Sequence, residues 1–196
     1  PLARTAGGKP APIRRRDGRA GDWLVSTGPH GLSRLGLGEL SSGLNSGLDP
    51  ELVGRAIAAH QRPRPRLDAV AALHASQPEG QAWRVGGTDS SDGLAAAVRS
   101  VAAASGCRAL LDRQRLPLDR AMAAMPEATA WCLEGGEDFE LVLALQPAWA
   151  ERLVAMLPGA QVIGSLVEGS AEGEAIAWLG EQGCVGDGAG FAHFHL

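Results

Sequence analysis

The sequence predicts an α/β domain in which helices pack on a mixed β-sheet. Short runs of β-prone residues, bounded by glycine and proline, alternate with segments of helical periodicity. The alternation is not strict, which favours a mixed sheet over a doubly wound parallel sheet. The chain has 196 residues, of which 45% are hydrophobic and 20% charged, so it is large enough to enclose a hydrophobic core.

The first half of the chain predicts one strand followed by three helices. Trp23–Thr27 is a β-prone run between glycine-containing turns. Leucines at helical spacing, diluted by glycine, predict a helix within residues 30–47. Residues Asp49–His60 begin with an N-cap aspartate and a proline at the first helical position, so they should form a second helix. The prolines of Arg62–Arg66 end it, and a third helix should follow over Leu67–Ser76.

The second half predicts strands and helices on either side of two acidic loops. Each strand is a short apolar run, and each helix has apolar residues three or four positions apart. The expected strands are Ala82–Val85, Arg108–Leu111, Phe139–Leu145, Gln161–Val167 and Glu174–Leu179. The expected helices run from Leu94 to Ser105 and from Pro147 to Leu157, and a further short helix should start at Leu116–Asp119.

Charge and hydropathy exclude several classes of protein. The 18 basic and 22 acidic residues give a net charge of −4, the wrong sign for a dedicated nucleic-acid binder. No apolar run approaches the roughly 18 residues that span a membrane, and the first residues lack the apolar stretch of a signal peptide. We therefore expect a cytoplasmic protein without a nucleic-acid or membrane partner. The widely spaced cysteines, Cys107, Cys132 and Cys184, should be reduced and structural.

The start of the chain predicts a fragment of a longer protein. It opens with Pro1 rather than methionine, and residues 1–20 are rich in glycine, proline and arginine without periodicity. We expect residues 1–20 to be a linker or the remnant of an earlier domain. Residues 21–196 should then form the α/β domain.

The first acidic loop lies where a strand should pass through a turn, Gly86–Gly93, into a helix. Asp89 and Asp92 are three positions apart in it, and two carboxylates this close repel unless a cation lies between them. Magnesium is the natural cation, since it binds carboxylates, water and phosphate oxygens. Ser91 and the first amides of the helix could bind a phosphate. The alternative is structural: Asp92 caps the helix and Asp89 shapes the turn.

The second acidic loop, Gly135–Glu140, precedes an apolar strand. Glu137 and Asp138 follow two adjacent glycines, which allow the backbone to approach a ligand closely. The two acids could accept hydrogen bonds from a ligand or help to bind a metal. Alternatively, the loop is a glycine turn with a solvated acidic edge.

Other charged and metal-binding residue types favour a structural explanation. His193 and His195 form an H-x-H pair near the C-terminus, but that segment offers no third ligand for a metal. The arginines of Arg62–Arg66 are expected to be a solvated linker, and those of Arg14–Arg16 to be either solvated or a phosphate site. The sequence contains no G-x-x-x-x-G-K-[ST] loop, which excludes a P-loop mechanism.

Taken together, the motifs resemble those of the thiamine-monophosphate kinase family. Their order is R-R-D-G-R-A-G-D-W-L-V-S-T-G, R-P-R-P-R, T-D-S-S-D-G-L-A-A, L-E-G-G-E-D-F-E-L and G-F-A-H-F. The family belongs to the superfamily of aminoimidazole-ribonucleotide synthetase, selenophosphate synthetase and a hydrogenase-maturation protein. The resemblance covers nearly the whole chain, but only the later part of the family's sequence. Residues 1–20 would therefore end a nucleotide-binding N-terminal domain, and the rest would be the C-terminal domain.

The resemblance implies roles for individual residues. Two aspartates would bind magnesium, a serine and an arginine would contact ATP, and a glutamate and a terminal aromatic residue would bind the substrate. In this chain these are Asp89 and Asp92, Ser91 and Arg15, and Glu137 and Phe191, respectively. The arginine is uncertain by one position within Arg14–Arg16, and no catalytic base is implied.

The chain departs from the family's pattern near these residues. Ser90 stands where the family usually has isoleucine, and Ala97 replaces a common aspartate. His30-Gly31-Leu32 occupies a place where Gly-Asp is frequent. Each position that carries a ligand role nevertheless keeps its chemistry.

The resemblance implies that the protein uses ATP and magnesium to phosphorylate thiamine monophosphate to thiamine diphosphate. Transfer would be direct and in line, in a homodimer formed chiefly through the N-terminal domain. One alternative is a sister enzyme of the superfamily that acts on another phosphate acceptor. The other is a module without turnover that binds substrate or supports a dimer. The isolated chain is expected to be inactive, because the N-terminal domain would carry most nucleotide and metal ligands.

Overall fold

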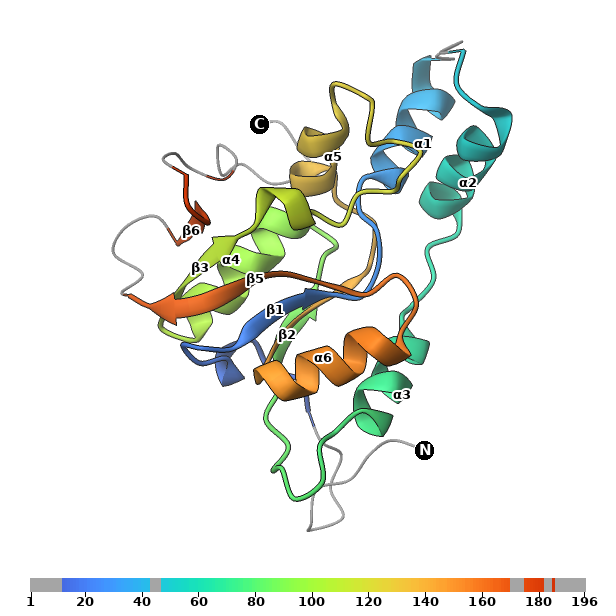
Figure 1. Ribbon diagram of the computed structural model, residues 1–196. Helices are drawn as coiled ribbons and strands as arrows, with labels where there is room; N and C mark the ends of the chain where they lie inside the picture. The colour runs from blue at the N-terminus through green and yellow to red at the C-terminus, as the bar shows by residue number, and fades with distance from the viewer. Residues whose placement is uncertain (1–11, 43–46, 170–174, 182–184, 186–196) are drawn as a thin grey trace.

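The computed structural model describes residues 12–42, 47–169, 175–181 and 185, which form a six-stranded β-sheet covered by helices (Figure 1). The strands lie in the order β2-β4-β1-β5-β3-β6. Their bounds are β1 Trp23–Ser26, β2 Gly86–Asp89, β3 Cys107–Leu111, β4 Leu141–Leu145, β5 Gln161–Glu168 and β6 Ile176–Trp178. Among the described strands, β3 and β6 pair in parallel and all other neighbours are antiparallel, so the sheet is mixed as predicted.

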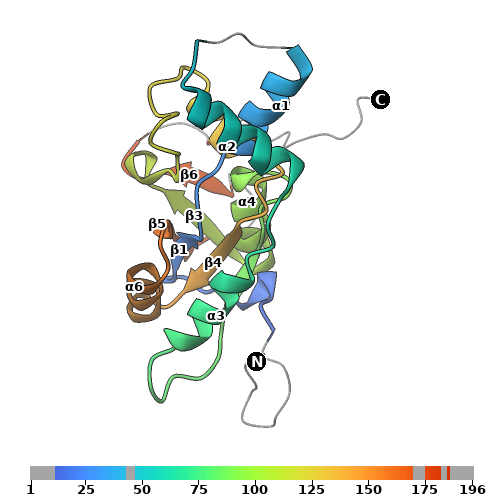
Figure 2. The ribbon, with the colours of Figure 1, turned by 90° about the vertical axis from the view of Figure 1, so that its right-hand side faces the viewer.

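Helices cover both faces of this sheet. Their bounds are α1 Leu32–Ser42, α2 Pro50–Gln61, α3 Leu67–Ala75, α4 Leu94–Ala104, α5 Ala128–Glu134 and α6 Pro147–Met156, with 3-10 turns η1 Arg15–Asp17 and η2 Arg113–Arg115. Helices α4 and α5 pack on one face, and α3 and α6 pack on the other. Figure 2 shows α4 and α6 on opposite sides of the sheet. Successive residues of β1 point to opposite faces, so Leu24 joins the α4 core and Val25 joins the α3–α6 core.

Helices α1 and α2 form a pair beyond the end of the sheet at which β1 finishes, and they share a smaller core with Met122 (Figure 1). Glycine dilutes the helical pattern of α1, yet it is what allows the two helices to approach closely. A Cβ atom placed on Gly36 would lie 2.1 Å from the carbonyl oxygen of Ala56 in α2. Asp49 caps α2 as predicted, because its carboxylate accepts a hydrogen bond of 2.9 Å from the amide of Glu51.

The strand before the first acidic loop lies later in the chain than predicted. Residues Ala82–Val85 are not a strand; β2 consists of Gly86–Asp89 and pairs with β4. Glycine is a poor strand former, but here a Cβ atom on Gly86 would lie 2.7 Å from the backbone nitrogen of Gly18. The close approach of another backbone segment explains why glycine occupies the strand, and why apolar patterning misplaced it.

Two further predictions were wrong in detail. Residues 116–119 form no helix; instead Pro117 accepts a hydrogen bond of 2.7 Å from the amide of His30 through its carbonyl oxygen. The helix lies later, at α5, which the sequence analysis did not predict. The strand expected from Phe139 begins at Leu141, because the backbone of Phe139 has a φ of 54° and cannot join an extended strand.

Two composition-based predictions concern membranes and thiols. None of the helices in the described ranges is long and apolar enough to cross a lipid bilayer. Of the described cysteines, Cys107 and Cys132 are buried thiols, as expected for structural residues. Burial raises the pKa of both thiols, which keeps them protonated and unreactive. Cys184 lies outside the described residues.

Candidate functional site

The two acidic loops meet at one end of the sheet. Strands β2 and β4 are antiparallel neighbours, with Asp89 opposite Leu141. The last residue of β2 and the first residue of β4 therefore lie side by side at the same end of the sheet. The amide of Glu137 donates a hydrogen bond of 2.7 Å to the carbonyl oxygen of Ser91. The amide of Ser90 donates one of 2.9 Å to the carbonyl oxygen of Glu140. These bonds join the loops along their backbones.

The first loop, residues 89–93, presents its acidic side chains to solvent rather than to helix α4. Asp89 and Asp92 are exposed, whereas Ser90 is fully buried. The N-cap of α4 is Gly93, and no side chain among the described residues caps this helix. The interpretation of Asp92 as a helix cap is therefore wrong. The first amides of α4 remain available for hydrogen bonds to a ligand.

Asp89 is held as a carboxylate. Its partial burial acts to raise the pKa, but hydrogen bonds from Ser91, from Thr88 and from nearby backbone amides outweigh this, and the pKa is lowered. The hydroxyl of Thr88 lies 3.2 Å from the Asp89 carboxylate. The group is ionised at neutral pH, as a ligand for a hard cation must be.

Of the three consecutive arginines, Arg15 lies beside this carboxylate. Its Nε donates a hydrogen bond of 3.1 Å to the hydroxyl of Thr88. Arg14 instead pairs with Asp17 at 3.5 Å on the surface, and Arg16 lines a pocket at the other end of the sheet. The structure thus places Arg15, rather than either neighbour, next to the first loop.

The donor set of the first loop suits magnesium, although it is incomplete. Asp89 and Asp92 offer exposed carboxylate oxygens, which are the ligands that magnesium prefers. The described residues contain no group of three histidine, cysteine, aspartate or glutamate side chains that could hold a metal ion. A magnesium ion bound here would take its other ligands from water, from phosphate oxygens or from residues beyond those described.

The second loop has an unusual backbone. Glu137 and Phe139 have φ angles of 59° and 54°, which lie in the left-handed region that residues other than glycine rarely adopt. The Glu137 carboxylate lies 3.4 Å from Nδ1 of His60 in α2, and this nitrogen lies 3.1 Å from the hydroxyl of Ser33 in α1. The α1–α2 pair therefore borders the glutamate, which sequence reasoning did not indicate.

Asp138 has a structural role that the sequence analysis missed. Its carboxylate accepts hydrogen bonds of 2.8 Å from the amide of Gly31 and 3.1 Å from the amide of Ser33, at the start of α1. Burial raises the pKa of Asp138 to about 6, despite these two bonds. Asp138 thus attaches the second loop to α1, and Glu137 is left as the accessible acid of the pair.

The last arginine of the proline-interrupted connector also holds the second loop. Arg66 forms an ion pair with Glu140 and donates a hydrogen bond of 2.8 Å to the carbonyl oxygen of Thr27. The hydroxyl of Thr27 donates one of 2.6 Å to Glu140. Burial raises the pKa of Glu140, although Thr27 and Arg66 act in the opposite direction. The prediction of a solvated linker is therefore wrong for Arg66.

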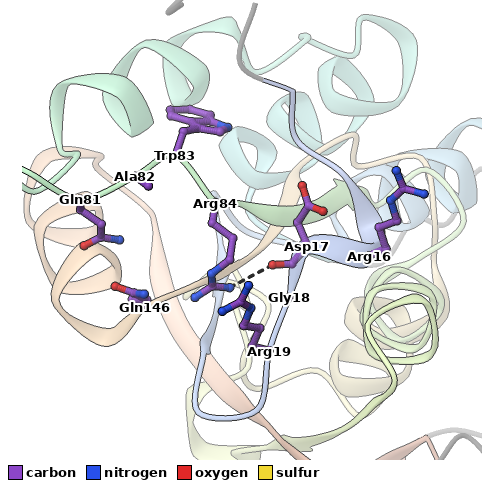
Figure 3. A pocket seen from close by; sticks show the side chains of 9 residues that line it. All are labelled: Arg16, Asp17, Gly18, Arg19, Gln81, Ala82, Trp83, Arg84 and Gln146. Carbon is purple, nitrogen blue, oxygen red and sulfur yellow. Dashed lines mark hydrogen bonds between the residues drawn. The ribbon is translucent and has the colours of Figure 1, made fainter. Parts of the chain in front are cut away.

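A polar pocket of about 490 Å³ lies at the opposite end of the sheet and is separate from this site (Figure 3). Gln146, which follows β4, lines it, whereas the second acidic loop precedes β4. Arg84 lines it too and donates a hydrogen bond to the carbonyl oxygen of Asp17 (Figure 3). Arg84 also donates two hydrogen bonds to the Asp22 carboxylate. Of the assigned residues that the structure describes, none of those for ATP, magnesium or substrate lines this pocket. Phe191, His193 and His195 lie outside the described residues.

Comparison with known proteins finds sequence and structural relatives of this chain. Residues 19–183 match the family model described as AIR synthase related protein, C-terminal domain. The thiamine-monophosphate kinase of Synechococcus elongatus is 49% identical over 163 residues, which cover 80% of this chain and 47% of that protein. That of Prochlorococcus marinus is 41% identical over 166 residues, covering 83% of this chain and 50% of that protein.

The fold agrees with these sequence matches. The solved structure of AaThiL complexed with AMPPCP and TMP superimposes with a TM-score of 0.71 and 27% identity, covering 93% of this chain and 54% of that chain. The chain spans about half the length of the curated relatives that it matches. Because the family model matches most of its residues, the chain belongs to the family of AIR synthase related proteins, through their C-terminal domain.

Proposed function

We propose that this chain is the C-terminal part of a kinase that transfers a phosphoryl group from ATP to thiamine monophosphate and forms thiamine diphosphate. One observation carries the proposal: the 2.7 Å hydrogen bond from the Glu137 amide to the Ser91 carbonyl oxygen. This bond places the loop proposed to bind substrate beside the turn proposed to bind ATP and metal. The similarity to thiamine-monophosphate kinases supports the same function.

The residues at the site suit in-line phosphoryl transfer, which depends mainly on alignment and on neutralising phosphate charge. Arg15 would bring a permanent positive charge to the ATP phosphates from its place beside Thr88. The first amides of α4 would donate hydrogen bonds to a phosphate, and the Ser91 hydroxyl would do so by turning from the Asp89 carboxylate. Glu137 would bind thiamine monophosphate from the neighbouring loop. No residue is required as a nucleophile, so transfer would involve no covalent enzyme intermediate.

Magnesium is the cofactor that this arrangement implies. Asp89 and Asp92 would hold it, and when bound it would neutralise charge on the phosphate oxygens. Asp89 is already ionised in the fold, because its hydrogen bonds lower its pKa. Neither carboxylate forms an ion pair with an arginine of the described residues. Both carboxylates therefore remain available to a metal.

The proposal concerns the complete protein of which this chain supplies the C-terminal domain. The relatives are about twice as long, and the described residues supply only part of a magnesium shell. We infer that the remaining ATP and metal ligands come from an N-terminal domain, of which residues 1–20 are the end. The complete enzyme would be a homodimer, and the 196-residue chain alone would show no turnover.

Glu137→Ala in the complete protein tests the division of roles between the loops. The KM for thiamine monophosphate should rise about 10- to 100-fold, the loss expected for a hydrogen bond to a charged group. The KM for ATP should change much less. The matched control is Glu151→Ala, which removes an exposed acid on α6 and should leave both constants unchanged. An equal rise in both KM values would contradict the assignment of Glu137 to the substrate.

The phosphate acceptor is tested in the same assay. The wild-type protein is supplied with ATP and, in turn, with thiamine monophosphate, an aminoimidazole precursor and selenide. We expect product only with thiamine monophosphate. Turnover of another acceptor instead would identify a sister enzyme of the superfamily, and turnover of none would indicate a binding module.

A further inference from the structure

A buried histidine connects the first acidic loop to the end of β1. The imidazole of His30 is fully buried, and its Nε2 lies 2.8 Å from the hydroxyl of Ser90. Its Nδ1 lies 3.2 Å from the carbonyl oxygen of Gly28 and 3.4 Å from the hydroxyl of Ser26. The backbone amide of His30 is itself anchored, since it donates to the carbonyl oxygen of Pro117 at 2.7 Å.

The partners of the ring determine which nitrogen carries the proton. The Gly28 carbonyl oxygen can only accept, so Nδ1 is the protonated nitrogen. Burial keeps the ring neutral, since it lowers the pKa of His30 to about 4, although the Gly28 bond opposes this. Nε2 is then an acceptor, and the Ser90 hydroxyl donates to it. Because both side chains are fully buried, water cannot replace the hydrogen bond between the Ser90 hydroxyl and His30 Nε2.

Ser90 holds the turn at three points. Its amide donates to the Glu140 carbonyl oxygen at 2.9 Å, its carbonyl oxygen accepts from the Gly93 amide at 3.0 Å, and its side chain reaches His30. Ser90 points into the protein, whereas Asp89 on one side is exposed and Ser91 on the other is partly exposed. Asp89 ends strand β2, in which successive side chains point to opposite faces, and Ser91 begins the turn that the hydrogen bond between Gly93 and Ser90 closes. The direction of Ser90 therefore determines where Asp89 and Ser91 point.

The hydrogen bond between His30 and Ser90 is directional. The family that the chain resembles usually has isoleucine at the position of Ser90, and an isoleucine side chain cannot form a hydrogen bond. A buried hydroxyl and a buried imidazole are each unfavourable unless they bond to one another, so the pair is stable in only one relative orientation. An apolar contact imposes no such direction. The pair thus provides orientation in addition to packing.

We propose that His30 and Ser90 are a positioning pair, which fixes the direction of Asp89 and Ser91 toward the phosphates and metal of the proposed kinase site. Neither residue contacts substrate; both act through the backbone of residues 89–91. The proposal rests on the proposed function for its effect on catalysis. It rests on the structure alone for its effect on the turn.

The kinetic test is a double-mutant cycle in the complete enzyme. Ser90→Ala and His30→Leu should each lower kcat on the order of 10- to 100-fold, the cost of misplacing a reacting geometry. Each should also raise the magnesium concentration needed for half-maximal rate. The double variant should be no worse than the more damaged single variant, because the two residues act as one unit. Ser90→Thr and His30→Gln, which keep the donor and the acceptor, should restore most of kcat.

The matched control is Ser76→Ala. Ser76 is also a buried serine with hydrogen bonds, to the Leu73 carbonyl oxygen and from Trp149, but it lies at the end of α3. Its loss should lower the melting temperature without changing kcat or the magnesium dependence. If Ser90→Ala behaved like Ser76→Ala, the residue would be structural only, and additive effects in the cycle would equally overturn the pairing.

Hydrogen exchange tests the pair without any reliance on activity. The amides of residues 90 and 137 form the hydrogen bonds that join the two loops. Both amides should exchange faster in Ser90→Ala and His30→Leu, and at the wild-type rate in Ser90→Thr. Unchanged exchange in the single variants would overturn the proposal, whatever the kinetics. Absence of kinase activity in the wild type, together with faster exchange in the variants, would refute the proposed function and support the pair's hold on the turn.

Discussion

Individual residues around the two loops are polar groups held away from water. Burial lowers the pKa of His30 to about 4 and raises the pKa of Asp138 to about 6, and it also raises the pKa of Glu140. Each has hydrogen-bond partners: Ser90 for the imidazole, the start of α1 for Asp138, and Arg66 for Glu140. A site built on such residues should be sensitive to pH in its stability as well as in its chemistry.

His30 makes the most definite contribution to that sensitivity. Its pKa is about 4 in the fold and near 6.5 in the unfolded chain, so the unfolded state binds the proton more readily between these values. Its contribution to stability is complete above pH 6.5 and is lost as the pH falls toward 4. Between pH 7 and pH 5 the wild type should lose about 2 kcal/mol more unfolding free energy than His30→Gln.

Denaturant unfolding of both proteins at the two pH values measures this difference. Other groups titrate equally in the two proteins, so the comparison isolates the imidazole. The same loss in the wild type and in the variant would show that His30 accepts a proton in the fold as easily as in the unfolded chain.

At this scale the sequence revealed the accessible acids but not the groups that hold them. Asp89 and Glu137 stand out because carboxylates next to glycine and serine are typical of ligand-binding turns. His30 and Arg66 gave no comparable signal, and nothing indicated that Asp138 would hold α1, since the partners of these three residues are 60, 74 and more than 100 positions away in the chain. Only the antiparallel pairing of β2 with β4, and of β4 with β1, brings these partners together.

Among the elements, the α1–α2 pair contributes most directly to the second loop. The start of α1 is capped by Asp138, and His60 near the end of α2 lies beside Glu137. The separation of the two helices therefore affects the position of the proposed substrate-binding acid. Gly36 determines that separation, because a Cβ atom there would meet the Ala56 carbonyl oxygen at 2.1 Å.

Gly36→Ala should destabilise the protein by about 1–3 kcal/mol, the usual cost of overpacking, since the helices would have to move apart. Gly54→Ala is the matched change on α2. A Cβ there would meet none of the described residues within 4 Å, so alanine should stabilise the helix by about 0.5–1 kcal/mol. Unfolding free energies of the two variants check both signs. Destabilisation by Gly54→Ala, or tolerance of Gly36→Ala, would contradict this description of the helix pair.

Elements with a strong local signal were predicted well. Helices α2 and α6 begin with proline at the first turn, and strand β1 is an apolar run between turns. Strand β2 and helix α5 were missed, because β2 contains two glycines whose role is close packing, and α5 has only 7 residues. Tertiary contacts, rather than local propensity, determine both.

At the scale of the whole molecule, the sheet separates two polar regions. The antiparallel order β2-β4-β1 gathers the acidic loops at one end, whereas the arginine-lined pocket lies at the other (Figure 3). The mixed sheet was predictable from the irregular order of strands and helices. The meeting of the loops depended on which strands are neighbours, and that order cannot be read from periodicity. The resemblance to a kinase family suggested that the two loops meet.

The most direct test of the kinase proposal is the rate of thiamine diphosphate formation by the complete protein carrying Asp89→Asn. The amide keeps the size of the side chain but removes the charge that would bind magnesium, so turnover should be abolished while the circular dichroism spectrum and melting temperature stay close to those of the wild type. Glu151→Gln, the same change on the exposed face of α6, should retain full activity. Wild-type turnover in Asp89→Asn would contradict the account.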